Sequence, residues 1–173
     1  MSVLGIRLLG DPVLREESEP VDSFDEELRA LVRDMRETMY EADGIGLAAP
    51  QVGVPLRVFV FDVREGEGAA GVLVNPVIEA RSGTTRSEEG CLSIPGISEI
   101  VERAESVVVT GRDADGEPVR IEADGRLAVC LQHETDHLDG VLFLDHLSPL
   151  KRRLALSRWS KREQEDAVSS RAL

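Results

Sequence analysis

The sequence predicts an α+β fold. Candidate strands cluster in the middle of the chain, and candidate helices lie before and after them, without the β–α–β alternation that builds a doubly wound sheet. The chain has 173 residues, 42% hydrophobic and 31% charged, which is enough to bury one core. No internal repeat or linker divides it. We therefore expect one domain over residues 1–173, with residues 148–173 as a C-terminal helix and tail.

The first helix is expected after Ser23. Ser23 and Glu26 have the spacing of a capping box, and apolar residues follow at helical intervals. This pattern ends at Asp43-Gly44. The glycine-rich segment 44–46 is predicted to be a loop that requires positive φ or close backbone approach.

The middle of the chain predicts strands. Residues 57–63 (RVFVFDV) form a continuous apolar run typical of a buried strand, and residues 72–78 predict a second strand, interrupted at Asn75-Pro76. Residues 106–111 and 118–123 are expected to pair as a hairpin, with alternate residues of the second strand facing inward.

Two helices are expected after the strands. Asp124 is the predicted N-cap of a helix that runs to about Asp139 and ends at Gly140. Ser148-Pro149 predicts the start of a third helix. Seven basic and three acidic residues lie in 151–173, so the net charge of −13 is concentrated in residues 1–150. Such an acidic body argues against DNA binding through a broad basic face.

The compartment is predicted from what the chain lacks. No apolar run approaches the roughly 20 residues that span a bilayer, and residues 1–7 do not resemble a signal peptide. Two cysteines, Cys91 and Cys130, argue against a disulfide framework. We expect a soluble cytoplasmic protein, with no membrane partner and with both thiols available for other chemistry.

The segment QHETDH (132–137) carries the clearest chemical pattern. On a helix, His133 and His137 project from one face about one turn apart, so both can bind one divalent metal. Glu134 lies where it can address a metal-bound water. Short HExxH strings also occur by chance, so this pattern alone leaves the metal site a hypothesis.

The third ligand distinguishes the candidate classes. Metzincins place a histidine where this chain has Phe143, which excludes that class. Glu163 or Glu165 could serve a peptidase that uses a remote glutamate ligand. Cys91, in the segment EGCLS, is the preferred candidate. With Cys130 and the two histidines it could also close a structural Cys₂His₂ site that has no open position.

Two other segments surround these candidates. Gly90 and Pro95 predict an irregular, rigid backbone around Cys91. The segment GIGLAAPQ (44–51) lacks the lysine of a phosphate-binding loop, so nucleotide binding is not expected. Its Gln51 could donate a side-chain N–H to a developing oxyanion, although a simple turn before an exposed glutamine also fits.

Together, GIGLAAPQ (44–51), EGCLS (89–93) and QHETDH (132–137) resemble the three motifs of the peptide deformylase family, in order and at suitable separations. The likeness extends to the first helix and to the tract GVLFLDHLSPLKRR (140–153). It implies an α+β metallohydrolase, with mixed or antiparallel sheets packed around a central HExxH-bearing helix. Such an enzyme removes the formyl group from N-formylmethionine of nascent polypeptides and releases formate.

The resemblance also implies roles for individual residues. Cys91, His133 and His137 would bind one divalent metal with water as the fourth ligand, most typically Fe²⁺ in the cell, with Zn²⁺, Ni²⁺ or Co²⁺ also accepted. Glu134 would be the general base and acid. The side chain of Gln51 and the metal would stabilise the oxyanion, together with the backbone N–H of Leu92.

Substrate binding follows from the same motifs. The backbone of Gly46 would pair with the extended peptide. The methionine pocket would be lined by Ile45, Val129, Cys130 and the edge of His133. Ser87 and Arg126 occupy places where relatives often carry apolar pocket residues, so this chain departs from the pattern at the outer pocket.

The predicted partners are N-formylmethionyl nascent peptides and, through the basic C-terminal helix, the ribosome. Relatives dock there by a C-terminal helix, and basic residues of this tail could contact rRNA phosphates: Lys151, Arg152, Arg153, Arg158, Lys161 and Arg162. A solvated helix face is the alternative. The resemblance and the absence of a transit segment imply a bacterial cytoplasm.

Overall fold

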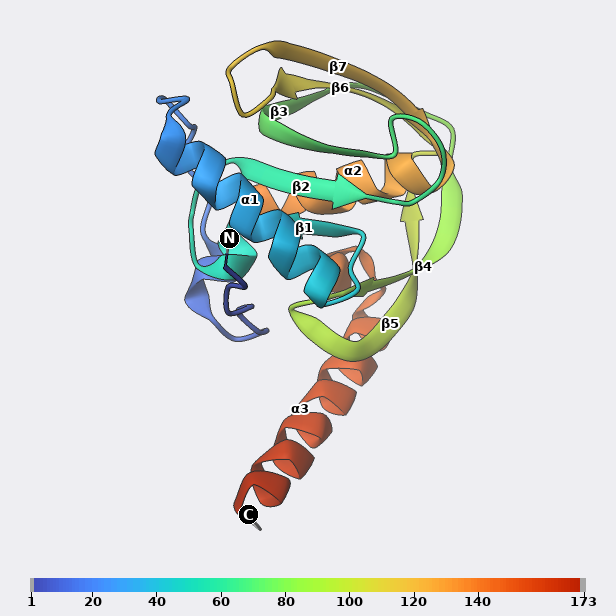
Figure 1. The fold of residues 1–173 in the computed structure, drawn as a ribbon. Helices are drawn as coiled ribbons and strands as arrows, with labels where there is room; N and C mark the ends of the chain where they lie inside the picture. The colour runs from blue at the N-terminus through green and yellow to red at the C-terminus, as the bar shows by residue number, and fades with distance from the viewer. Residues whose placement is uncertain (1, 172–173) are drawn as a thin grey trace.

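The computed structural model describes residues 2–171 (Figure 1). Its α-helices are α1 (Glu26–Glu41), α2 (Gly125–Leu138) and α3 (Pro149–Arg171). Its strands are β1 (Gly46–Ala48), β2 (Val58–Asp62), β3 (Ala70–Ser82), β4 (Thr85–Cys91), β5 (Ile94–Arg103), β6 (Ser106–Arg112) and β7 (Pro118–Asp124). Short 3₁₀ helices are η1 (Pro12–Arg15), η2 (Ala49–Val52) and η3 (Phe143–His146). The predicted α+β class is confirmed.

A five-stranded antiparallel sheet in the order β1-β2-β3-β6-β7 forms the centre of the fold. Figure 1 shows α1 in front of β2 and α2 behind it. Val58 and Val60 pack with α1 side chains, whereas Phe59 and Phe61 pack with α2 side chains. This double coverage explains why β2 is an uninterrupted apolar run, and the strand predicted over 57–63 is confirmed.

Strand β3 is longer than the segment predicted over 72–78. The interruption expected at Asn75-Pro76 is a bulge within a continuous strand, with a register shift against β6 and with Asn75 at φ 52°. Asn75 Oδ1 accepts the Val21 N–H at 2.8 Å, and its Nδ2 donates to the Val21 carbonyl at 3.0 Å. The local sequence indicated the break, but pairing with β6 extends the strand beyond it.

The first helix is confirmed, but its predicted cap is wrong. Helix α1 begins at Glu26, and its N-cap is Asp25, whose Oδ1 accepts the Leu28 N–H at 3.0 Å. A carboxylate at this position satisfies the free N–H and also interacts favourably with the helix dipole. Asp25 therefore takes the role expected of Ser23.

In the segment after α1, the glycines serve close backbone approach, which is one of the two predicted reasons for them, and not positive φ. Asp43, not a glycine of 44–46, adopts the left-handed conformation, at φ 56°. A Cβ built on Gly44 would lie 2.7 Å from Leu92 Cδ1, and one built on Gly46 would lie 2.5 Å from Glu134 Oε1. The predicted loop is partly wrong, because Gly46 begins β1, which pairs with β2.

Strands β4 and β5 form a separate two-stranded sheet, in place of the irregular segment predicted around Cys91. Cys91 ends β4, and a two-residue turn, Leu92-Ser93, leads into β5. The prediction of an irregular segment was wrong because β4 (TRSEEGC) is mostly polar and lacks the apolar alternation by which a strand is recognised in a sequence. Pairing with β5, not its own hydrophobicity, makes it a strand.

The later elements largely agree with expectation. Strands β6 and β7 form the predicted hairpin, and alternate β7 side chains pack on the cluster around α2: Val119, Ile121 and Ala123. Helix α2 follows Asp124, which has the N-cap position but makes no side-chain capping bond. Gly140, at φ 73°, follows the end of this helix as expected.

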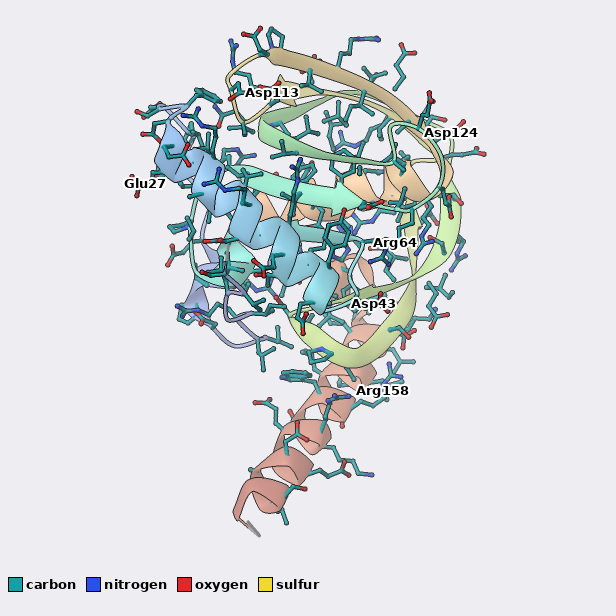
Figure 2. The ribbon with its side chains drawn as sticks, in the orientation of Figure 1. Glu27, Asp43, Arg64, Asp113, Asp124 and Arg158 are labelled. Carbon is teal, nitrogen blue, oxygen red and sulfur yellow. The ribbon has the colours of Figure 1, made fainter. Side chains whose placement is uncertain are left out.

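Helix α3 begins at the predicted Pro149. Its first half is anchored, since Ala155 and Trp159 pack in a cluster with apolar side chains of β5. Arg158, labelled in Figure 2, forms an ion pair with Glu99. Beyond these contacts the helix extends away from the body (Figure 1). In the described part of the chain, no helix has both the length and the apolarity to cross a membrane.

Candidate metal centre and active site

Helix α2 holds the HExxH string in the middle of the fold. Leu131 and Leu138 are fully buried in the core cluster that α2 shares with the central sheet. His133 and His137 project together, with their Nε2 atoms 3.3 Å apart. Cys91, at the end of β4, brings its Sγ to 3.5 Å from His137 Nε2. Residues far apart in the sequence therefore meet at one point.

These three ligand atoms fit a single divalent metal ion. All lie within 4.8 Å of one another. Tetrahedral coordination of a zinc-sized ion, with bonds of about 2.0–2.3 Å, separates two nitrogens by about 3.3 Å and a sulfur from a nitrogen by about 3.6 Å. The observed 3.3 and 3.5 Å agree. Three protein ligands leave the fourth position open, as catalytic centres require.

Glu89 orients His133. Its Oε1 lies 2.8 Å from His133 Nδ1, so Nε2 faces the other ligand atoms. Arg103 donates two hydrogen bonds of 2.9 Å to Glu89, and both side chains are almost fully buried. Burial raises the pKa of Glu89, but the hydrogen bonds from Arg103 and His133 outweigh burial and hold the pKa at about 2. An ionised Glu89 strengthens His133 as a metal ligand.

The network continues behind the histidines. Arg103 Nη1 donates to Asp136 Oδ2 at 2.5 Å, and the same oxygen lies 2.8 Å from His146 Nε2. The sequence analysis missed Glu89 and Arg103 as functional residues. The need of a buried metal-binding histidine for a carboxylate partner could have pointed to Glu89, beside the candidate ligand Cys91. No local pattern marks Arg103.

Glu134 lies beside the ligand atoms and is only 4% exposed. Its Oε1 is 4.0 Å from His133 Nε2, and its Oε2 is buried without a hydrogen-bond partner among the described residues. Burial raises the pKa of Glu134 to about 7. A carboxyl group with this pKa can accept and release protons near neutral pH.

Gln51 is buried, in contrast to the exposed glutamine of the simple-turn interpretation. The Ala48 N–H donates to Gln51 Oε1 at 2.9 Å, and Gln51 Nε2 donates to Ser93 Oγ at 3.0 Å. Nε2 also lies 3.5 Å from Cys91 Sγ. These contacts fix the carboxamide with its N–H groups toward the ligand cluster. Ser93, wholly buried, was not singled out from the sequence.

A cavity of about 730 Å³ opens beside this cluster. Its walls include all the residues predicted to bind substrate and several of those predicted to act in catalysis: Ile45, Gly46, Gln51, Cys91, Leu92, Val129, Cys130, His133 and Glu134. The Cys130 thiol donates to the Ile45 carbonyl at 3.6 Å and lies outside the group of converging ligand atoms in residues 2–171. This arrangement favours the open three-ligand site over the closed four-ligand alternative. Glu163 and Glu165 are exposed on α3 and also lie outside that group.

Comparison with known proteins identifies the family. Residues 3–153 match the family model described as polypeptide deformylase. The chain belongs to this family. A peptide deformylase of Acidothermus cellulolyticus is 54% identical over 156 residues, covering 90% of this chain and 85% of that protein. A peptide deformylase of Brucella suis is 53% identical over 165 residues, covering 93% of this chain and 94% of that protein.

Similarity to solved structures supports the same family assignment. A crystal structure of a peptide deformylase from Legionella pneumophila superposes with a TM-score of 0.90 at 47% identity, covering 96% of this chain and 98% of that one. A peptide deformylase from Synechococcus elongatus, in complex with actinonin, has a TM-score of 0.85 at 48% identity, covering 90% and 86%. The resemblance of the three motifs is confirmed. This chain is a peptide deformylase-family hydrolase that removes the N-formyl group from nascent polypeptides, and its Cys91, His133 and His137 form a site compatible with one divalent metal.

Proposed function

We propose that Cys91, His133 and His137 hold one divalent metal, Fe²⁺ in the cell, and that Glu134 is the general base and acid of deformylation. One observation above all supports this: three ligand atoms converge at the wall of a cavity that Cys91 and His133 line, beside a buried carboxylate whose pKa is raised to about 7. Mixed Cys/His ligation also suits Zn²⁺, Ni²⁺ and Co²⁺. Fe²⁺ is the ion that the family resemblance implies.

Glu134 moves the proton in this proposal. When bound, the ion supplies an acidified water and a positive charge beside the formyl group. Glu134 takes a proton from the attacking water while the oxygen of that water adds to the formyl carbon. The same carboxyl group then delivers the proton to the amine nitrogen as the C–N bond breaks. Formate leaves, and the peptide keeps a free amino terminus.

Gln51 and Leu92 stabilise the negative charge that develops on the formyl oxygen. Gln51 Nε2 donates one N–H from the side chain, and Leu92 donates its backbone N–H. The Ala48 N–H and Ser93 Oγ hold the Gln51 carboxamide in one orientation before substrate arrives. A donor that is already oriented needs no reorganisation during the reaction, so its full interaction is available to the transition state.

The cavity binds the substrate by shape. In this proposal, the backbone of Gly46, on the edge strand β1, pairs with the extended peptide. Ile45, Val129 and Cys130 line the pocket for the methionine side chain. A formyl carbon carries only hydrogen beside its oxygen, so a tight site excludes acetyl groups.

Replacing Glu134 tests the assignment. We expect Glu134→Gln to reduce formate release from formyl-Met-Ala to a small residual rate while metal content and thermal midpoint stay near those of the parent, because Glu134 is not a ligand. Glu27→Gln, at the exposed start of α1 (Figure 2), is the matched control and should remain active. Loss of bound metal from Glu134→Gln would contradict the division of roles. Metal analysis of anaerobically purified protein tests Fe²⁺ directly.

We further propose that residues 1–173 act as one catalytic domain in a bacterial cytoplasm, with residues 148–173 as its C-terminal helix and tail, and that this helix contacts rRNA phosphates. Exposed basic residues near the start of α3 support the contact: Lys151, Arg152 and Arg153. Changing these three to Gln should reduce co-sedimentation with ribosomes at low salt. Changing Glu163 and Glu165 to Gln is the control. Equal pelleting of both variants would contradict the contact.

A further inference from the structure

The charges that line the cavity are unequal. Its walls contain four acidic residues: Asp43, Glu88, Glu89 and Glu134. Among the described residues that line it, Arg126 is the single Lys or Arg. Within residues 2–171, Arg126 is thus the one residue of the cavity wall with a permanent positive charge, and the other charged residues of the wall are mostly acidic.

Arg126 lies outward from the reacting centre. It is the second residue of α2 and precedes His133 by seven positions, which corresponds to about 10 Å along the helix. Val129 and Cys130 occupy the wall between them. Because an extended peptide advances about 3.3 Å per residue, Arg126 is at the distance of residues that follow the methionine.

The positive charge of Arg126 acts electrostatically on Cys130 in the cavity wall. Burial raises the pKa of the Cys130 thiol, the Glu134 carboxylate raises it further, and the Arg126 guanidinium opposes both. Since Cys130 forms part of the wall, the guanidinium acts on the same space that a substrate enters.

The partner of Arg126 is easily exchanged. Arg126 Nη1 lies 3.3 Å from Glu65 Oε1, and the two side chains are 53% and 59% exposed. Exposed pairs of this kind are weak and are screened by salt. Glu65 is not part of the cavity wall. A substrate carboxylate can therefore replace Glu65 at little cost.

We propose that Arg126 is a specificity-determining residue that recognises a carboxylate on the side chain of an Asp or Glu downstream of the formylmethionine, in competition with Glu65. This inference rests on the proposed deformylase site, since it assumes that the substrate occupies this cavity. Arg126 offsets the acidic mouth of the cavity for acidic nascent chains.

The other charges at the mouth have different surroundings. Asp43 faces Arg64, 3.4 Å away, across the gap between the end of α1 and the end of β2 (Figure 2). Glu88 accepts a hydrogen bond from Ser98 Oγ at 2.7 Å. The Ser98 hydroxyl is neutral and does not offset the charge of Glu88, so removing Arg126 leaves the mouth acidic, which favours basic substrates.

The test compares matched peptides within each enzyme. Formyl-Met-Asp-Ala-amide and formyl-Met-Lys-Ala-amide differ in the second residue, and formyl-Met-Ala-Asp-amide and formyl-Met-Ala-Lys-amide differ in the third. The readout is the acidic-to-basic ratio of kcat/KM for formate release, which cancels differences in metal loading. Formyl-Met-Ala with a free carboxyl terminus, beside its amide, distinguishes a terminal carboxylate from a side-chain one.

Two variants that break the same ion pair should act in opposite directions. Arg126→Gln should lower the acidic-to-basic ratio by about two- to five-fold, through KM, and Glu65→Gln should raise it. Both changes should shrink in 0.5 M NaCl. Unchanged ratios, changes in the same direction in both variants, or a response to the terminal carboxylate alone would overturn the inference. If the metal-loaded parent released no formate from any peptide, the proposed function itself would fail.

Discussion

Gly46 is the position where one added carbon should do most damage to catalysis. A Cβ at Gly46 would lie 2.5 Å from Oε1, 2.8 Å from Cδ and 2.9 Å from Cγ of Glu134. An ordinary carbon–oxygen contact is about 3.3 Å, so the carboxylate must retreat by about 0.8 Å. Displacement of a catalytic group by about 1 Å costs roughly 100-fold in rate, or about 2.7 kcal/mol in the barrier. We expect this loss of kcat from Gly46→Ala.

The assay should separate catalysis from folding. Steady-state formate release gives kcat and KM, calorimetry gives the thermal midpoint, and metal analysis shows whether the ligands are intact. Gly46 has no positive φ, so alanine adds no backbone strain, and the midpoint should fall by only a few degrees. Gly5→Ala, which meets no atom within 4 Å, is the control.

A double variant sharpens the comparison. If Gly46→Ala acts by displacing Glu134, then adding it to Glu134→Gln should cause little further loss, because both changes act on the same carboxylate. Full additivity would refute the steric argument. So would an increase in KM with unchanged kcat, which would indicate lost pairing between the Gly46 backbone and the peptide.

Three further outcomes follow from the structure. Arg103→Met leaves its carboxylate partner buried without a counter-charge, so calorimetry should show a midpoint about 10 °C lower; a fall below about 2 °C would contradict this. Cys91→Ser should lose bound metal by elemental analysis, whereas Cys130→Ser should retain it; equal loss would restore the four-ligand site. Burial raises the pKa of Asp145, but hydrogen bonds from Arg15 and the Leu142 N–H outweigh it and lower the pKa below 3.8. The stabilisation from Asp145 is therefore complete above its unfolded pKa and lost as pH falls through the folded one, so Asp145→Asn should flatten the acid limb of the midpoint–pH curve.

Local sequence patterns were enough to predict the helices, the buried strand and the pair of metal-binding histidines, because these depend on residues close together in the chain. Helical periodicity located α1, start and stop signals located α2 and α3, and the apolar run of β2 located the buried strand. The spacing of His133 and His137 places both rings on one face of any helix, whatever surrounds it. At α1 the local pattern predicted the wrong N-cap, Ser23 in place of Asp25. Both residue types can cap a helix, and the choice depends on how the chain enters the helix.

Long-range pairing decided the rest. The polar strand β4 becomes a strand only against β5, and this hairpin brings Cys91 to the two histidines on α2. The family resemblance identified Cys91 as a metal ligand. Residue spacing alone did not exclude Cys130, Glu163 or Glu165 as further or alternative ligands. The converging atoms favour Cys91 over those alternatives.

The second layer of the site has no counterpart in the linear sequence. Glu89 holds His133, Arg103 holds Glu89, and Ser93 orients Gln51. Each contact joins residues more than ten positions apart, and a buried charge acquires its partner only when the chain is packed. The sequence therefore determined which groups can do the chemistry, because helix geometry and side-chain identity are local. The packed chain decided how they are held, because burial and pairing depend on all the elements together.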